Sequence, residues 1–214
     1  MQREGHRKVA LSLFGEARED APVTEASIFT DRLELVPITA DLVRAVLAND
    51  RARCEGLVGA RFPDDWPGRV FVERAFTIDL EAVLTKPEVR LWGDRVLVTR
   101  HGPRSVVGSI IFHGKPLETG RASLAYGVER ASQGRGYATE SVRACVAWAL
   151  EQNEVRAVEA TTTPWHRTSI RVLLKAGMRQ IDTVDHLMLG ELVVFAIDRG
   201  MELPPLTIPS NLPL

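Results

Sequence analysis

A short run of glycine and polar residues, QGRGYA at positions 133–138, has the composition of an anion-binding turn. A helix-like apolar pattern follows it directly, so the turn lies where a helix begins. The first backbone N–H groups of a helix have no partner within the helix and carry a partial positive charge. Gly134 and Gly136 lack the Cβ atoms that would keep an oxyanion at a distance, and Arg135 adds a cation between them. The stretch therefore predicts a site for a pyrophosphate group.

Three other interpretations compete with pyrophosphate binding at this turn. The dinucleotide-binding pattern G-x-G-x-x-G needs a third glycine where this chain has Thr139. That pattern also needs an acidic residue at the end of the next strand, whereas Glu159 of this chain lies within the strand. The lysine of a P-loop is absent from the motif. A plain strand-to-helix turn without a ligand stays open, because Gly-x-Gly is common at such places.

The elements that must position this turn alternate between strand and helix. Strands are predicted at 32–38, 95–100, 105–113, 121–128, 155–163, 178–187 and 191–198. Helices are predicted from Thr39 onward and at 67–84, 136–151 and 166–176, with a Gly- and Pro-rich loop at 54–68. The strand–helix–strand unit at 121–163 predicts a parallel pair with a right-handed crossover, and the hairpins on either side predict antiparallel pairs. The sequence thus indicates an α/β (α+β) fold with a mixed sheet and helices on both faces.

The two helices after the turn are amphipathic. Cys145 lies on the apolar stripe of the first helix, so we expect it in the core rather than as a nucleophile. In the second helix, Ile170, Leu173 and Leu174 are predicted to face inward. The outward face carries the cations Arg167, Arg171 and Lys175.

The amino-acid composition limits which cellular locations and binding partners are expected. The chain has 214 residues, of which 45% are hydrophobic and 26% charged, and its net charge is −1, so no overall field attracts it to nucleic acid or to an anionic membrane. The two cysteines, Cys54 and Cys145, are far apart and form no CxxC pair, which argues against a disulfide framework or a metal site. No apolar run approaches the length of a membrane span, and the charged N-terminus does not have the pattern of a secretory signal. We therefore expect a cytoplasmic protein.

Three segments are expected along the chain. Residues 1–28 carry mixed charge without a clean period and form an N-terminal extension. Residues 29–198 contain all the predicted strands and form one domain. Residues 199–214 form a C-terminal tail with four prolines in LPPLTIPSNLPL, which cannot continue a helix or enter a sheet interior.

The stretch YGVERASQGRGYATESVRACVAWAL resembles the acetyl-CoA signature of the GNAT N-acetyltransferase superfamily, whose places are filled by Gln133, Gly136 and Ala138. The segments TDRLELVPITADL, PDDWP and TSIRVLLKAGM are similar to the RimJ/RimL-like branch, the ribosomal-protein-alanine acetyltransferases. The resemblance covers about residues 29–198. It implies a GNAT-like, mostly antiparallel sheet with a central parallel pair that splays apart, usually by means of a bulge. It also implies acetyl transfer from acetyl-CoA to a primary amine by direct attack in a ternary complex.

The resemblance also assigns the parts of the cofactor site. Tyr126, Gly127 and Val128 would lie along the pantetheine arm, and the backbone amides of residues 134–139 would hold the pyrophosphate. Ser169 would lie near the thioester sulfur. His166, at the place of the Asn that usually contacts the cofactor, could contact the pantetheine or relay a proton, although a helix cap or surface histidine is the more common explanation. The basic face of the second helix could lie near the 3′-phosphate, although such a face is usually only solvated. The full set of expected cofactor-binding residues is Tyr126, Gly127, Val128, Gln133, Gly134, Arg135, Gly136, Tyr137, Ala138, Thr139, His166 and Ser169.

The chain departs from the family pattern where catalysis is expected. The place of the usual glutamate base is Ser123, and the place of the usual tyrosine acid is Leu173. Ser169 is then the candidate proton donor to the departing thiolate, with Ser123 as the second candidate catalytic residue. An alternative function therefore stays open, a non-catalytic acyl-CoA-binding module for sensing or assembly.

The acceptor side is less well defined by the sequence. Two carboxylates and an indole at Asp64, Asp65 and Trp66 could receive a cationic amine, although a surface turn is the more common explanation of such residues. The expected partner is a small-molecule amine or a protein N-terminus, without nucleic acid, membrane or metal. The oligomeric state is open, a homodimer included.

Overall fold

The computed structural model describes residues 26–64, 80–116 and 118–201 of the chain. Its strands are β1 (Ile28–Phe29), β2 (Leu33–Pro37), β3 (Arg95–Thr99), β4 (Val106–Phe112), β5 (Arg121–Val128), β6 (Ala157–Thr162), β7 (Arg179–His186) and β8 (Gly190–Asp198). Its helices are α1 (Ala40–Leu47), α2 (Arg51–Val58), α4 (Leu80–Thr85), α5 (Pro87–Arg90), α6 (Tyr137–Glu151) and α7 (Arg167–Lys175), with a 3₁₀ turn at Arg130–Ser132.

The strands form one eight-stranded sheet in the order β1-β2-β3-β4-β5-β6-β8-β7. Only the β5–β6 pair is parallel, and every other neighbouring pair is antiparallel. Helix α6 connects the two parallel strands, as the strand–helix–strand unit predicted. The mixed sheet expected from the sequence is confirmed.

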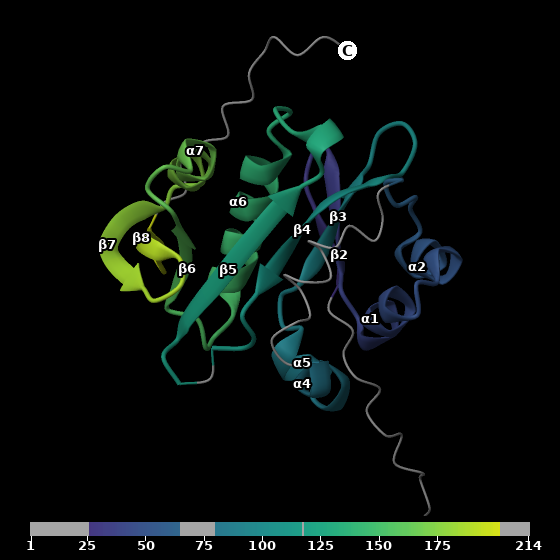
Figure 1. Cartoon of the computed structure of the whole chain (residues 1–214), viewed down its shortest axis with the longest axis horizontal. Helices are drawn as coiled ribbons and strands as arrows, with labels where there is room; N and C mark the ends of the chain where they lie inside the picture. Colours follow the sequence, from purple (N-terminus) through teal and green to yellow (C-terminus); the bar gives the residue numbers. More distant parts are fainter. Residues whose placement is uncertain (1–25, 65–79, 117, 202–214) are drawn as a thin grey trace, which may run out of the picture.

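Two separate cores cover the two faces of the sheet (Figure 1). On one face, α6 and α7 bury Val142, Val146 and Leu173 against inward residues of the central strands. On the other face, α1 and α2 bury Val43 and Cys54 against the opposite side of β3 and β4. Because strand side chains alternate between faces, β3 and β4 each contribute to both cores. Helices therefore lie on both faces, as expected.

The parallel pair parts after three residues. β5 pairs with β6 only at Arg121↔Ala157, Ala122↔Val158 and Ser123↔Glu159. Beyond this point β5 stays with β4 as far as Val128, while β6 stays with β8 as far as Thr162. A split thus opens between two strands that belong to the same sheet.

The bulge expected at this split does not interrupt β5. The β4–β5 register runs without a break from Phe112↔Leu124 to Gly108↔Val128, and the nearest irregularity lies between β3 and β4. Gly108 is needed in this register, because a Cβ there would lie 2.2 Å from the carbonyl oxygen of Gly127. The two strands separate because each follows its antiparallel partner.

Two other expectations need correction. Residues 54–68 were expected to be a loop, but α2 occupies the first part, where Asp50 caps the helix and Gly59 ends it in a left-handed conformation at φ 67°. Leu174 was expected inward, but it is 53% exposed, because only the stripe through Ser169 and Leu173 faces the core. The helix predicted at 67–84 is described only at Leu80–Thr85, and the rest lies outside the described residues.

Two findings bear on ligands and membranes. No helix in the described ranges is long and apolar enough to cross a membrane. In the same ranges, no three His, Cys, Asp or Glu side chains come together in a way that could hold a metal ion.

Candidate active site

The beginning of α6 presents backbone N–H groups that have no partner. Gly134 and Gly136 both adopt left-handed conformations, at φ 78° and 83°, and Gly136 is the N-cap residue and has no side chain to cap the helix. Glu140 is the first residue whose N–H bonds back to the turn, to the oxygen of Gly136 at 3.1 Å. No described residue accepts a hydrogen bond from the N–H groups of residues 134–139. This is the arrangement that binds an oxyanion.

Strand β5 supplies a second set of unpaired backbone groups. The N–H of Glu129 bonds to Val107 and the oxygen of Ser123 accepts from His113, so odd-numbered residues of this strand face β4. By alternation, the N–H groups of Tyr126 and Val128 face the split, where β6 has moved away. The side-chain amide of Gln133 donates to the oxygen of Val128 at 3.0 Å and ties the strand end to the turn. An extended ligand can pair with this edge as a strand would.

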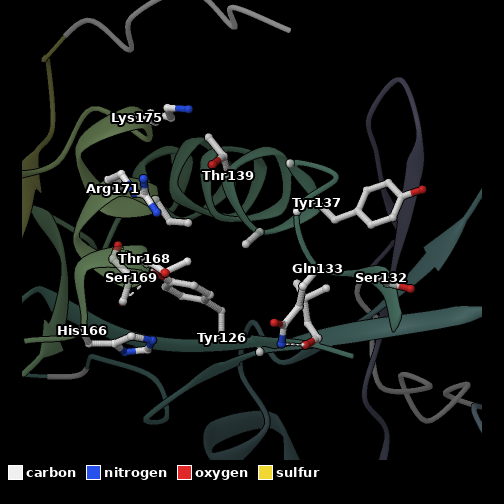
Figure 2. Close-up of a pocket in the computed structure, with 16 residues that line it drawn as sticks. Tyr126, Ser132, Gln133, Tyr137, Thr139, His166, Thr168, Ser169, Arg171 and Lys175 are labelled. Atoms are coloured by element: carbon white, nitrogen blue, oxygen red, sulfur yellow. Dashed lines mark hydrogen bonds between the residues drawn. The ribbon is translucent and has the colours of Figure 1, made fainter. Parts of the chain in front are cut away.

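The turn and the strand edge line one cleft of about 620 Å³, which α7 closes from the other side (Figure 2). Among the described residues, its lining contains no acidic residue, and two cations, Arg171 and Lys175, come from α7. The lining residues are Tyr126, Gly127, Val128, Ser132, Gln133, Gly134, Gly136, Tyr137, Ala138, Thr139, His166, Thr168, Ser169, Arg171, Val172 and Lys175. The cleft is therefore suited to a long anionic ligand that has its charge at the α6 end.

A model of the GNAT acetyltransferase domain matches residues 32–179. The chain belongs to the GNAT acetyltransferases. YjdG of Bacillus subtilis, an uncharacterized N-acetyltransferase, is 26% identical over 148 residues, which make up 69% of this chain and 86% of YjdG. This acetyltransferase is therefore an N-acetyltransferase by family, and the family uses acetyl-CoA.

Solved acetyltransferase structures share the fold. A GNAT-family acetyltransferase from Bacillus anthracis matches with a TM-score of 0.54 and 17% identity, over 81% of this chain and 98% of that one. RimL, a ribosomal L7/L12 alpha-N-protein acetyltransferase in complex with coenzyme A, matches with a TM-score of 0.51 and 11% identity, over 80% of this chain and 97% of that one. At such identities the likeness establishes the fold alone.

Two hydroxyl groups meet in the cleft of this acetyltransferase. The hydroxyl oxygens of Tyr126 and Ser169 lie 2.8 Å apart, and the tyrosine hydroxyl also donates to the backbone oxygen of Ser169 at 3.2 Å. Burial raises the pKa of the Tyr126 phenol, while the hydrogen bond with Ser169 acts in the opposite direction. The phenol therefore stays protonated at neutral pH and can donate a proton. The sequence suggested only a backbone role for Tyr126 and did not reveal this pair, whose members come from β5 and α7.

His166 lies on the same wall of the cleft, where the chain leaves β6 for α7 (Figure 2). Its Nδ1 lies 3.4 Å from the hydroxyl oxygen of Thr162, and its ring neighbours that of Trp165, with centroids 6.1 Å apart. No other histidine of the described ranges lines the cleft. The imidazole can therefore exchange a proton with a bound molecule.

Most of the cofactor residues expected from the sequence come together here, with one exception. All of them line the cleft except Arg135, whose backbone oxygen instead accepts a hydrogen bond from Arg32 Nη1 at 2.9 Å. The sequence did not single out Ser132, Thr168 or Val172 as lining residues. Thr168 and Val172 could have been found from helical spacing, because they lie three residues before Arg171 and Lys175 respectively.

Only some of the expected catalytic and acceptor residues lie in the cleft. Ser169 lines the cleft, but Ser123 does not, and by strand alternation its side chain lies on the opposite face of β5 from Tyr126. Asp64 is fully exposed, 3.9 Å from the guanidinium of Arg51, and is not among the lining residues. Its neighbours in the expected acceptor loop, Asp65 and Trp66, lie outside the described residues.

Proposed function

We propose that this acetyltransferase binds acetyl-CoA in the cleft and acetylates a primary amine by direct attack in a ternary complex. The observation that carries the proposal is the set of unpartnered N–H groups at residues 134–139, next to a strand edge that has lost its neighbour. The first feature matches a pyrophosphate and the second matches the amides of a pantetheine arm. The cations Arg171 and Lys175 add positive charge on the facing wall.

The reaction requires two proton transfers, one from the amine nitrogen and one to the sulfur. The amine nitrogen bonds to the acetyl carbon and the carbon–sulfur bond breaks, so nitrogen loses a proton and sulfur gains one. The N–H of Val128, which faces the split, is suited to stabilise negative charge that develops on the acetyl oxygen. We assign the proton for sulfur to the Tyr126–Ser169 pair, because the raised pKa of the phenol keeps that proton available.

The acceptor proposed is an α-amine, such as a protein N-terminus. No carboxylate lines the cleft in the described part of the chain, and His166 is the only imidazole among its lining residues there. An α-amine has a pKa of about 7.7–8.0, whereas a lysine amine has one of about 10.4, so the α-amine is far more often in its reactive neutral form. A site without a strong base therefore favours the α-amine. The ribosomal N-terminal acceptor in the name of RimL is of this class.

The test is release of free thiol from acetyl-CoA with three matched peptides. One has a free N-terminus and no lysine, one is N-terminally blocked and contains a lysine, and one is blocked without lysine. We expect the highest kcat/KM for the free N-terminus and no turnover of the third peptide. Preference for the lysine peptide would overturn the choice of acceptor, and failure to bind coenzyme A would overturn the whole proposal.

A second candidate function is an acyl-CoA-binding module without turnover. It is favoured by one observation, that Leu173, which stands at the usual place of the tyrosine acid, is fully buried and cannot donate a proton. Tight binding of coenzyme A without thiol release on any amine, including polyamines, would support this function over catalysis.

A further inference from the structure

A buried carboxylate lies one turn into α6, close to the proposed pyrophosphate site. The side chain of Glu140 is only 4% exposed, and four donor atoms surround its two oxygens. One oxygen accepts from the Thr30 hydroxyl at 2.6 Å and from the backbone N–H of Arg32 at 3.0 Å. The other accepts from Nε of Arg32 at 2.8 Å and lies 2.6 Å from its Nη2. The carboxylate is thus saturated with donors from the β1–β2 turn.

This saturation bears directly on the free N–H groups of the helix. An acidic residue in the first turn of a helix often stabilises the unpaired N–H groups itself, by reaching back to them or through its charge. Here the Glu140 carboxylate has no acceptor site to spare, since a carboxylate offers about four. The N–H groups of residues 134–139 therefore remain open to an outside anion.

Arg32 also touches the turn itself. Its Nη1 donates to the oxygen of Arg135 at 2.9 Å, and its guanidinium lies over the ring of Tyr137, 5.1 Å from the centroid. A Cβ on Gly136 would lie 3.3 Å from its Nη2, so the guanidinium packs directly on the N-cap residue. A single side chain thus neutralises the buried carboxylate and fixes one carbonyl of the turn.

We propose that Arg32 is a positioning residue for the cofactor, which keeps the Glu140 charge neutralised and turned away so that α6 can bind a pyrophosphate. The inference rests on the proposed function, because it concerns affinity for coenzyme A. Without Arg32, an uncompensated negative charge would lie beside the anion site and repel the ligand. If the ion pair were purely structural, removing Glu140 in addition to Arg32 would weaken coenzyme A binding further or leave it weak. If Arg32 acts by neutralising Glu140, removing Glu140 as well should restore binding.

The experiment compares coenzyme A affinity by calorimetry in four full-length proteins, the wild type, Arg32→Met, Glu140→Gln and the double variant. We expect Arg32→Met to weaken binding about tenfold or more, the scale of an unpaired charge near a bound anion. The double variant should bind several-fold more tightly than Arg32→Met, and Glu140→Gln should bind about as well as the wild type. If the double variant binds no more tightly than Arg32→Met, the inference is wrong.

A matched control removes a cation from the same surface. Arg100 lies over the ring of Phe29 and donates to the backbone oxygen of Thr30, but it does not touch Glu140. Arg100→Met should leave the affinity unchanged, and a loss equal to that of Arg32→Met would overturn the inference. If Arg32→Met does not fold, Thr30→Val can be used instead, because it removes one donor from the same carboxylate. This variant should weaken coenzyme A binding to a smaller extent, and unchanged binding would contradict the inference. Failure of the wild type to bind coenzyme A would instead refute the proposed function.

Discussion

Replacing Tyr126 by phenylalanine tests whether the Tyr126 hydroxyl acts in catalysis or only stabilises the fold. The change removes the contacts to the Ser169 hydroxyl at 2.8 Å and to its backbone oxygen at 3.2 Å, and keeps the ring in the core. The Ser169 side chain is buried at 9% exposure, so its hydroxyl loses a partner that water replaces poorly. We expect a loss of about 1–2 kcal/mol in the free energy of unfolding. For a domain of this size that corresponds to about 2–4 °C in Tm per kcal/mol.

The effect on turnover should be larger than the effect on stability. Loss of a general acid lowers kcat by about 100-fold or more. A factor of 100 is about 2.7 kcal/mol in the activation free energy. The assay is thiol release with saturating acetyl-CoA and a free N-terminal peptide. The KM for acetyl-CoA should change little, because the phenol acts after the cofactor has bound.

Two further measurements decide whether the hydroxyls act together. If Tyr126 and Ser169 form one proton-donating unit, the double variant Tyr126→Phe/Ser169→Ala should be no slower than the slower single variant. Because burial raises the pKa of Tyr126, the rate should not fall by loss of this acid until the pH rises above about 10. A kcat for Tyr126→Phe within threefold of the wild type, with the expected loss of stability, would refute the catalytic role.

Three other predictions concern the turn, the core and the cysteines. Gly136→Ala should weaken coenzyme A binding by about tenfold, because the φ of 83° at this residue costs an L-residue about 1–2 kcal/mol. The control is Gly102→Ala, which introduces similar strain at φ 72° in a distant turn. This variant should lower Tm without changing the affinity for coenzyme A. Leu173→Ala should lower the free energy of unfolding, measured in urea, by about 2–5 kcal/mol, and a smaller loss would contradict its full burial. Cys54 and Cys145 should react with a thiol reagent only after denaturation, because both are fully buried and burial raises the pKa of Cys54; rapid reaction of the native protein would contradict this.

Local patterns in the sequence were enough to predict the central strands and their helices. Thr39 caps α1 as expected, because its hydroxyl accepts from the N–H of Leu42. The periodicity of α6 placed Cys145 in the core, where it is fully buried. Helix α2 was missed, because the apolar residues of RARCEGLV do not gather on one face and the segment has an internal glycine, so only its caps distinguish it from a loop.

The parts of the site that depend on distant contacts could not be predicted from spacing. Tyr126 and Ser169 are 43 residues apart, and Arg32 and Glu140 are 108 residues apart, so no local period connects either pair. The turn at residues 134–139 was recognisable because its chemistry is local, with two glycines at the beginning of a helix. Sequence reasoning therefore located the turn proposed to bind the anion but missed the side chains that contact this turn from distant parts of the chain.

The early parting of β5 and β6 has a consequence for the unliganded protein. In the part of the chain that the structure describes, three rungs of strand pairing and the Arg121–Glu159 ion pair join the first five strands of the sheet to the last three. A molecule that bridges this seam would supply the missing rungs, so the amides of Tyr126 and Val128 should exchange quickly with deuterium when the cleft is empty and slowly when it is filled. Occupancy would also stabilise the whole domain, by about 2.7 kcal/mol at a ligand concentration of one hundred times Kd. The seam between β5 and β6 is thus the place where cofactor concentration would be coupled to the lifetime of the fold.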